Sequence, residues 1–290
     1  MVAAASHISP LRYPGGKSRI WEHLAAQYAQ APLGELDVEI WFEPFAGGLG
    51  AGLKMLQESI IGELWFCEAN RGLAALWGEL VGNPTALIDT VASLPERMSL
   101  DVYNEALGVL TAPDSSPQVQ VAVAALVVNR CSRSGMVTPT AGPIGGKRQD
   151  GKYRVGDRWN LPRTIGTLEK LAPLTRYMRF VGPDGISALA GLPDSGFAEE
   201  VFVFADPPYV GAGERLYQHG LDEAGHRALA DALHGLDETH WVLAYDEAPL
   251  VRELYAGLCI QEYALHHTAN RSKAGAELLI YGPGTHPVSA

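Results

Sequence analysis

Residues 199–210 read EEVFVFADPPYV. The unbroken apolar run VFVFA is typical of a strand buried on both faces, as the strands of a parallel sheet are. Pro207 and Pro208 end this strand, because proline lacks the N–H of the ladder and stiffens the residues around it. The stretch therefore predicts Asp206 held rigidly at the end of a central strand, with the aromatic ring of Tyr209 three positions further on.

Strand and helix patterns alternate on both sides of this motif. Before the motif, residues 37–57 predict a strand, a glycine-rich turn and a helix, and residues 63–70 contain a second strand, which ends at Glu68. After it come a helix over 222–236, a strand over 239–247, and a terminal antiparallel pair over 258–268 and 276–283. Strands that alternate with helices predict an α/β fold with a mostly parallel sheet.

The middle of the chain breaks this alternation. Residues 71–180 contain no series of strongly buried strands. Helical patterns recur to about residue 129, and residues 130–165 are rich in glycine, proline and arginine, which predicts loops or hairpins. We therefore expect a core domain made of residues 1–70 and 181–290, with an inserted, mainly helical lobe over residues 71–180.

Length and composition exclude several classes of protein. The 290 residues are 47% apolar, enough for one sizeable core or a core with an inserted lobe. No run approaches the roughly 18 apolar residues of a membrane span, and the first residues lack the features of a secretory signal. Three scattered cysteines suit a reducing cytoplasm and indicate neither a disulfide framework nor a zinc site. We expect a cytoplasmic protein with no membrane partner and no metal.

The charge is distributed unevenly. The formal net charge is −11, which argues against a surface that coats nucleic acid uniformly. Residues 130–179, however, carry eleven Lys and Arg against three Asp and Glu. This segment is either a solvated loop face or a local patch that binds a polyanion.

A glycine-rich turn and an acidic residue follow two predicted strands, at the edge where open α/β sheets bind ligands. Gly47 and Gly48 in FEPFAGG, residues 42–48, let the backbone approach a ligand closely, and Glu68 follows 21 residues after Gly47. An acid at that spacing can accept hydrogen bonds from ribose hydroxyls, so the pattern supports a cofactor that carries a nucleoside. A strict G-x-G-x-x-G is absent.

The DPPY motif suits a planar amine. The Asp206 carboxylate and the Pro207 carbonyl can each accept one hydrogen of an exocyclic NH₂, while Tyr209 stacks on the ring. Holding both hydrogens directs the nitrogen lone pair towards an electrophile. The alternative is a purely structural turn at the end of a strand.

Residues 11–20 read LRYPGGKSRI, and GGKS at 15–18 resembles the last residues of a phosphate-binding loop. Such a loop needs a glycine five positions before the final one, and Leu11 stands there. A nucleotide-binding ATPase is therefore disfavoured, and the Gly-Gly-Lys segment needs another role.

The motifs RYPGGK, EPFAGG, CEAN, NR…GPIGG…GKYR and ADPPY occur in the order seen in Dam-like adenine-specific DNA methyltransferases. The later AYDE and AELLI segments are also similar, so the resemblance covers nearly the whole chain. It implies a Rossmann-like methyltransferase sheet with a terminal antiparallel strand pair, and S-adenosylmethionine as the methyl donor. The reaction that it implies is methyl transfer to N6 of an adenine extruded from DNA.

The resemblance also implies roles for individual residues. The cofactor would contact Tyr13 and Lys17, and Lys17 would pair with the carboxylate of the cofactor. The pocket would be lined by Pro44, Phe45 and Gly47, and Glu68 would hold the ribose. Asp206, with Pro207 and Tyr209, would lie beside the cofactor and the target amine. The family often has Asp where Glu68 stands. Asp184 aligns with another family acid near the adenine of the cofactor.

The family's target-recognition residues fall where the basic segment lies. We expect double-stranded DNA as the partner, with Arg130, Arg133, Lys147 and Arg154 as contacts. The alternatives are cytosine N4 in DNA, adenine in structured RNA, and a non-catalytic DNA-binding regulator with a relic cofactor fold. The sequence leaves open the recognised site, a partner restriction endonuclease and the oligomeric state.

Overall fold

The computed structural model describes residues 9–12, 17, 20–31, 39–210, 220–263 and 277–288. No helix in these ranges is long and apolar enough to cross a membrane.

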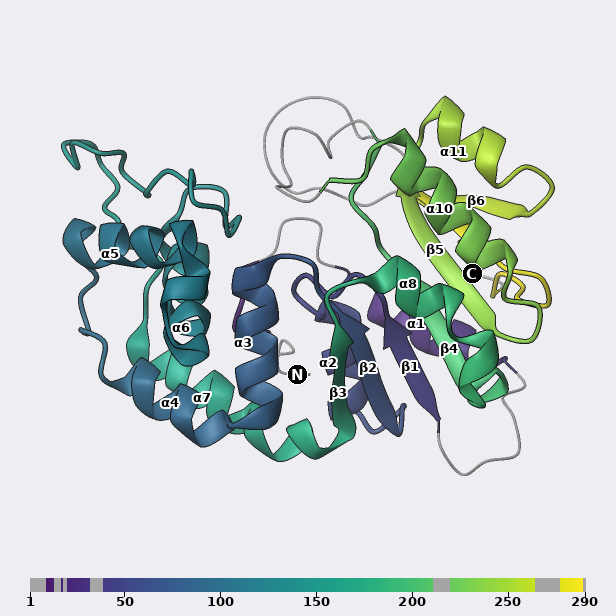
Figure 1. Cartoon of the computed structure of the whole chain (residues 1–290), viewed down its shortest axis with the longest axis horizontal. Helices are drawn as coiled ribbons and strands as arrows, with labels where there is room; N and C mark the ends of the chain where they lie inside the picture. The colour runs from purple at the N-terminus through teal and green to yellow at the C-terminus, as the bar shows by residue number, and fades with distance from the viewer. Residues whose placement is uncertain are drawn as a thin grey trace, which may run out of the picture.

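A seven-stranded sheet forms the centre of the molecule (Figure 1). Its strands are β1 (Ile40–Glu43), β2 (Glu63–Cys67), β3 (Met178–Gly182), β4 (Val201–Ala205), β5 (His240–Asp246), β6 (Cys259–Tyr263) and β7 (Glu277–Tyr281). The order is β3-β2-β1-β4-β5-β7-β6; β7 is antiparallel to β5 and β6, and the other neighbouring pairs are parallel. The predicted α/β fold class, a Rossmann-like sheet with a terminal antiparallel pair, is confirmed.

Burial explains why the central strands form. The side chains of β1, β4 and β7 are buried along their whole length, as expected for strands covered on both faces. Helices α1 (Trp21–Tyr28), α2 (Gly50–Gln57), α8 (Gly185–Ala190), α10 (Glu223–His234) and α11 (Pro249–Leu254) accompany the sheet. The Asp222 side chain caps α10 by accepting a hydrogen bond of 2.8 Å from the Gly225 N–H.

The chain between β2 and β3 forms a helical lobe at one side of the sheet (Figure 1). It contains α3 (Arg71–Gly82), α4 (Pro84–Ala92), α5 (Leu100–Thr111), α6 (Gln118–Cys131), α7 (Leu161–Leu171) and the short helices η2 (Pro113–Ser115) and η3 (Ala172–Tyr177). Helix α6 is buried almost all round and packs against α3, α4 and α5. The sheet resumes with β3, which begins at Met178, so the last three residues of the range 71–180 expected for the lobe belong to the sheet.

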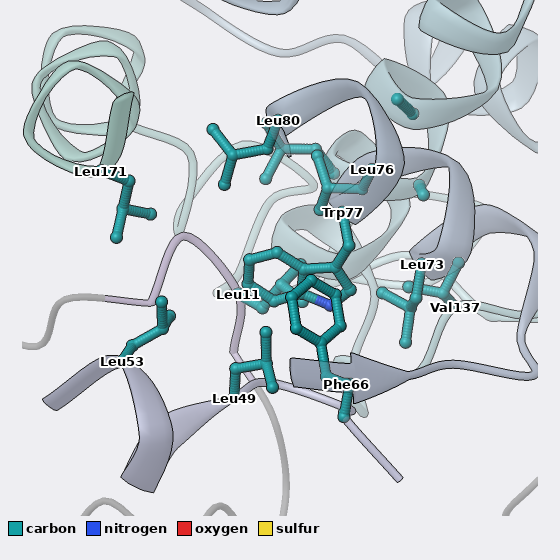
Figure 2. Close-up of a cluster of buried hydrophobic side chains, with 14 of the residues drawn as sticks. Leu11, Leu49, Leu53, Phe66, Leu73, Leu76, Trp77, Leu80, Val137 and Leu171 are labelled. Atoms are coloured by element: carbon teal, nitrogen blue, oxygen red, sulfur yellow. The ribbon is translucent and has the colours of Figure 1, made fainter. Parts of the chain in front are cut away.

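The lobe and the sheet share one hydrophobic core (Figure 2). Trp77 of α3 packs edge-on against Phe66 of β2, with ring centroids 6.1 Å apart, and Leu11 from the N-terminal segment belongs to the same cluster. The indole N–H of Trp77 also donates to the Gly47 carbonyl at 3.0 Å. Helix α3 therefore fixes the lobe directly against the glycine-rich turn after β1.

Candidate active site

A pocket of about 320 Å³ opens where β1, β2, β3 and β4 end. The segments that follow these strands line it, because the carboxyl ends of parallel strands meet at one edge of a sheet. Its apolar wall includes Leu49, Leu73 and Val137, which belong to the core cluster of Figure 2. A volume of this size is typical of a small-molecule site.

The pocket brings together most of the residues that the sequence singled out for cofactor binding and catalysis. Those that line it are Lys17, Pro44, Phe45, Gly47, Glu68, Asp206, Pro207 and Tyr209. Tyr13 lies outside the described residues. The individual roles of these residues stay predictions.

The Glu68 carboxylate joins the loops that follow β1 and β2. One oxygen accepts from the Gly47 N–H at 2.8 Å, and the other accepts from the Asn70 N–H at 2.7 Å. Gly47 has a φ of 47°, in the left-handed region that favours glycine, and this brings its N–H to the carboxylate. Burial raises the pKa of Glu68 to about 7, against the lowering effect of the two N–H donors.

Lys17 is buried, and its ammonium lies among acidic groups. Nζ donates to both oxygens of Asp206, at 2.8 and 2.9 Å, and to the Tyr209 hydroxyl at 2.9 Å. Glu277 at the start of β7 lies 3.7 Å from the same nitrogen. The ammonium that the resemblance pairs with a cofactor carboxylate is thus already bonded to Asp206, and it opposes the rise in the pKa of Asp206 that burial causes.

Tyr209 is anchored through its hydroxyl. The group accepts from Lys17 and donates to Glu277 at 2.9 Å. The next residue, Val210, donates its N–H to the Asp246 carboxylate on β5 at 3.0 Å. These contacts, with the two prolines, hold the DPPY segment between β4 and β5, so the Tyr209 ring is positioned before any ligand binds.

The pocket is strongly acidic. Among the described residues that line it, four carry carboxyl groups, namely Glu43, Glu68, Asp184 and Asp206, against the single ammonium of Lys17. Lys17 pairs with Asp206, and burial raises the pKa values of Glu43 and Glu68 to about 7, so the lining is moderately negative near neutral pH. Such a lining suits a cationic ligand better than a polyphosphate.

Sequence reasoning missed two acidic residues of this site. Glu43 is 5% exposed at the end of β1; one of its oxygens accepts from the Trp41 indole N–H at 3.0 Å and from the Gly52 N–H at 2.7 Å. Burial raises the pKa of Glu43 to about 7. An acid that ends an apolar strand is a usable local signal for Glu43, whereas no local signal places Glu277 beside Lys17.

The expected nucleic-acid contacts lie outside this pocket. Arg130 is on the last turn of α6, and Arg133, Lys147 and Arg154 are exposed in the segment that follows. Backbone hydrogen bonds from Arg133 to Gly142 and from Ile144 to Cys131 form a hairpin, in a segment for which the sequence predicted loops or hairpins. Its tip reaches the pocket, because Met136, Val137 and Thr138 line one wall.

The chain was compared with known proteins. No family model matches it, and no curated protein matches it. Among solved structures, an rRNA methyltransferase from Streptomyces viridochromogenes is similar at 14% identity with a TM-score of 0.40, over 97% of this chain and 94% of that one. A superposition this loose carries no argument about function, which rests on the site itself.

Proposed function

We propose that this chain is an S-adenosylmethionine-dependent DNA methyltransferase that acts on N6 of an adenine extruded from the duplex. One observation carries the proposal: Asp206, Tyr209 and Lys17 share one pocket with the glycine-rich turn and Glu68. A site for a planar amine therefore adjoins a site for a nucleoside-bearing cofactor at the ligand-binding edge of the sheet.

The charge of the pocket supports this cofactor. S-adenosylmethionine carries a sulfonium and an ammonium against one carboxylate, and it supplies an electrophilic methyl group. The described lining holds four carboxyl groups against one ammonium, and two of the four have pKa values raised to about 7, so it suits such a cation better than a nucleoside triphosphate. Glu68 would take the ribose hydroxyls on the acceptor sites that the Gly47 and Asn70 N–H groups leave free, since a carboxylate offers about four.

The DPPY segment would orient the amine. Asp206 pairs with Lys17 and keeps acceptor sites free for one amine hydrogen, and the Pro207 carbonyl would take the other. The Tyr209 ring, fixed through its hydroxyl, would stack on the base. Extruding the base costs a few kcal/mol, and correct positioning of the amine supplies much of the rate. No covalent intermediate with the protein is needed.

Labelled methyl transfer into unmethylated duplex DNA and, in parallel, into structured RNA tests the proposal, with the nucleosides digested and separated. We expect label in N6-methyladenine, and its loss in Asp206→Asn, which keeps the size of the side chain and removes its charge. Asp194→Asn, at an exposed position outside the pocket, is the matched control. Label in N4-methylcytosine or only in RNA would reassign the acceptor. Cofactor binding with no transfer to either would favour the non-catalytic regulator.

A further inference from the structure

A second pocket, of about 390 Å³, lies on the lobe and shares no lining residue with the first. It lies between residues 9–12, the end of α6 and the start of α7. Among the described residues, four arginines line it, namely Arg12, Arg130, Arg158 and Arg163, against one carboxylate, Asp157.

The four guanidiniums are not neutralised within the protein. In the described part of the chain none of them forms an ion pair. Arg12 donates to three backbone carbonyls, those of Asn129, Arg130 and Ser132 at 3.2–3.5 Å, and the Asp157 carboxylate accepts from the Arg154 N–H at 2.9 Å. Arg12 is therefore held by neutral groups, and within the described ranges no carboxylate pairs with any of the four guanidiniums.

Arg130 has a buried donor that no described group satisfies. Its Nη2 donates to the Arg158 carbonyl at 3.2 Å, but its Nε is buried and has no hydrogen-bond partner in the described ranges. Burial and the nearby Arg163 and Arg158 lower the pKa of Arg130; burial and the nearby Arg158 and Arg130 likewise lower that of Arg12. A free donor and like charges that repel one another are typical of a site completed by an anion.

We propose that this second pocket binds a backbone phosphate of the DNA duplex whose base enters the first pocket. Guanidiniums match the geometry of phosphate oxygens and bind them in a bidentate manner. This proposal rests on the proposed function for the identity of the polyanion, while the anion site itself rests on the four arginines.

Chain geometry places both pockets within reach of one duplex. Arg12 lines the second pocket, and Lys17, five residues later, lines the first. Five residues span at most about 18 Å, so the Cα atoms of Arg12 and Lys17 are separated by no more than the length of about five base-pair steps of DNA. The buried Asn129 side chain joins the two regions: Oδ1 accepts from the Arg12 N–H at 2.8 Å, and Nδ2 donates to the carbonyls of Arg12 and Gly135.

The first test measures the affinity for duplex DNA against salt concentration, for wild type, Arg158→Ala and Arg163→Ala. Both side chains are exposed, and within the described ranges neither side chain forms an ion pair or a hydrogen bond. We expect about tenfold weaker binding for each variant and a salt slope shallower by about one. Arg252→Ala, an exposed arginine on α11 paired with Glu247 and Glu262, removes the same charge and is expected to leave both quantities unchanged. Unchanged affinity and slope in the two pocket variants would overturn the proposal.

A second measurement separates the anion site from a structural role. Inorganic phosphate is expected to raise the melting temperature of the wild type more than that of Arg163→Ala. Without phosphate, the variant is expected to melt no lower than the wild type, because one of four repelling charges is gone. A lower melting temperature of the variant in buffer alone, with an equal response to phosphate, would contradict the site.

The two proposals fail differently. If the wild type methylates DNA but the pocket variants bind it normally, the pocket proposal is wrong and the function stands. If no methyl transfer occurs yet the variants still lose DNA affinity and salt slope, the pocket stands without the enzyme. If phosphate stabilises only the wild type and DNA does not bind at all, a small phosphorylated ligand replaces DNA and the proposal of a duplex contact is wrong.

Discussion

Replacing Lys17 by methionine removes the cation on which the acidic cluster depends. The side chain is 3% exposed, and its Nζ donates to both oxygens of Asp206 and to the Tyr209 hydroxyl, with Glu277 at 3.7 Å. Breaking a buried ion pair by removing one partner typically costs about 3–5 kcal/mol, because the other charge is left unpaired. The Asp206 side chain is 24% exposed, so the expected cost lies at the lower end of this range, about 3 kcal/mol. We expect a loss of this size in the free energy of unfolding near pH 8.

The loss is expected to depend on pH. Burial already raises the pKa of Asp206, and Lys17 opposes that rise, so the variant raises the pKa further. A carboxyl whose folded-state pKa exceeds its unfolded value of about 4 costs stability as the pH rises from 4 through the folded-state pKa. The variant is therefore expected to lie closer to the wild type at pH 5 than at pH 8, by about 1.4 kcal/mol for each unit of added pKa shift.

Urea unfolding at pH 5, 6.5 and 8 measures this prediction. Lys54→Met is the matched control, since Lys54 forms an i,i+4 pair with the exposed Glu58 and such pairs contribute about 1 kcal/mol or less. The double variant Lys17→Met/Asp206→Asn is expected to recover much of the loss, as the two residues are in contact. A loss below about 1 kcal/mol, or one equal at all three pH values, would refute the reasoning.

Three further substitutions probe the site and its supports. Glu43→Gln keeps an oxygen for its two hydrogen-bond donors and removes a carboxyl with a pKa of about 7. We expect the free energy of unfolding in urea to rise by roughly 1–3 kcal/mol at pH 8 and to stay unchanged at pH 4; a lower value at pH 8 would contradict this. Gly185→Ala places a Cβ 2.0 Å from the Pro44 carbonyl oxygen, and we expect it to lower the melting temperature and to weaken S-adenosylmethionine binding, both measured by calorimetry. The control is Gly191→Ala, whose Cβ would meet nothing closer than 3.5 Å and which is expected to change neither quantity. Asn129→Ala removes three hydrogen bonds to backbone groups and is expected to lower the free energy of unfolding in urea by about 2–4 kcal/mol. A loss below about 1 kcal/mol would show that Asn129 does not hold the segments around Arg12 and Gly135 together.

Much of the fold could be predicted because its signals are local. The apolar run before Asp206 and the glycine-rich turn after Phe42 each define a strand and its end, and β4 and β1 lie where these patterns place them. The edge at which parallel strands end then predicts which segments meet, and Pro44, Gly47, Glu68 and Asp206 do line one pocket. Residues 118–130 could be read as a buried helix or a buried strand, because an apolar run without period fits both; packing against α3 and α5 makes them a helix.

The sequence by itself determined the α/β class, the ends of the central strands and the acidic residues that follow them. The tertiary structure alone decided that Lys17 bonds Asp206 across 189 positions, that Glu277 completes this cluster, and that Arg12 joins Arg130, Arg158 and Arg163 around a second pocket. The reason is physical. Backbone propensity and apolar period act over a few neighbouring residues, whereas charge pairing acts between any groups that packing brings within a few ångströms.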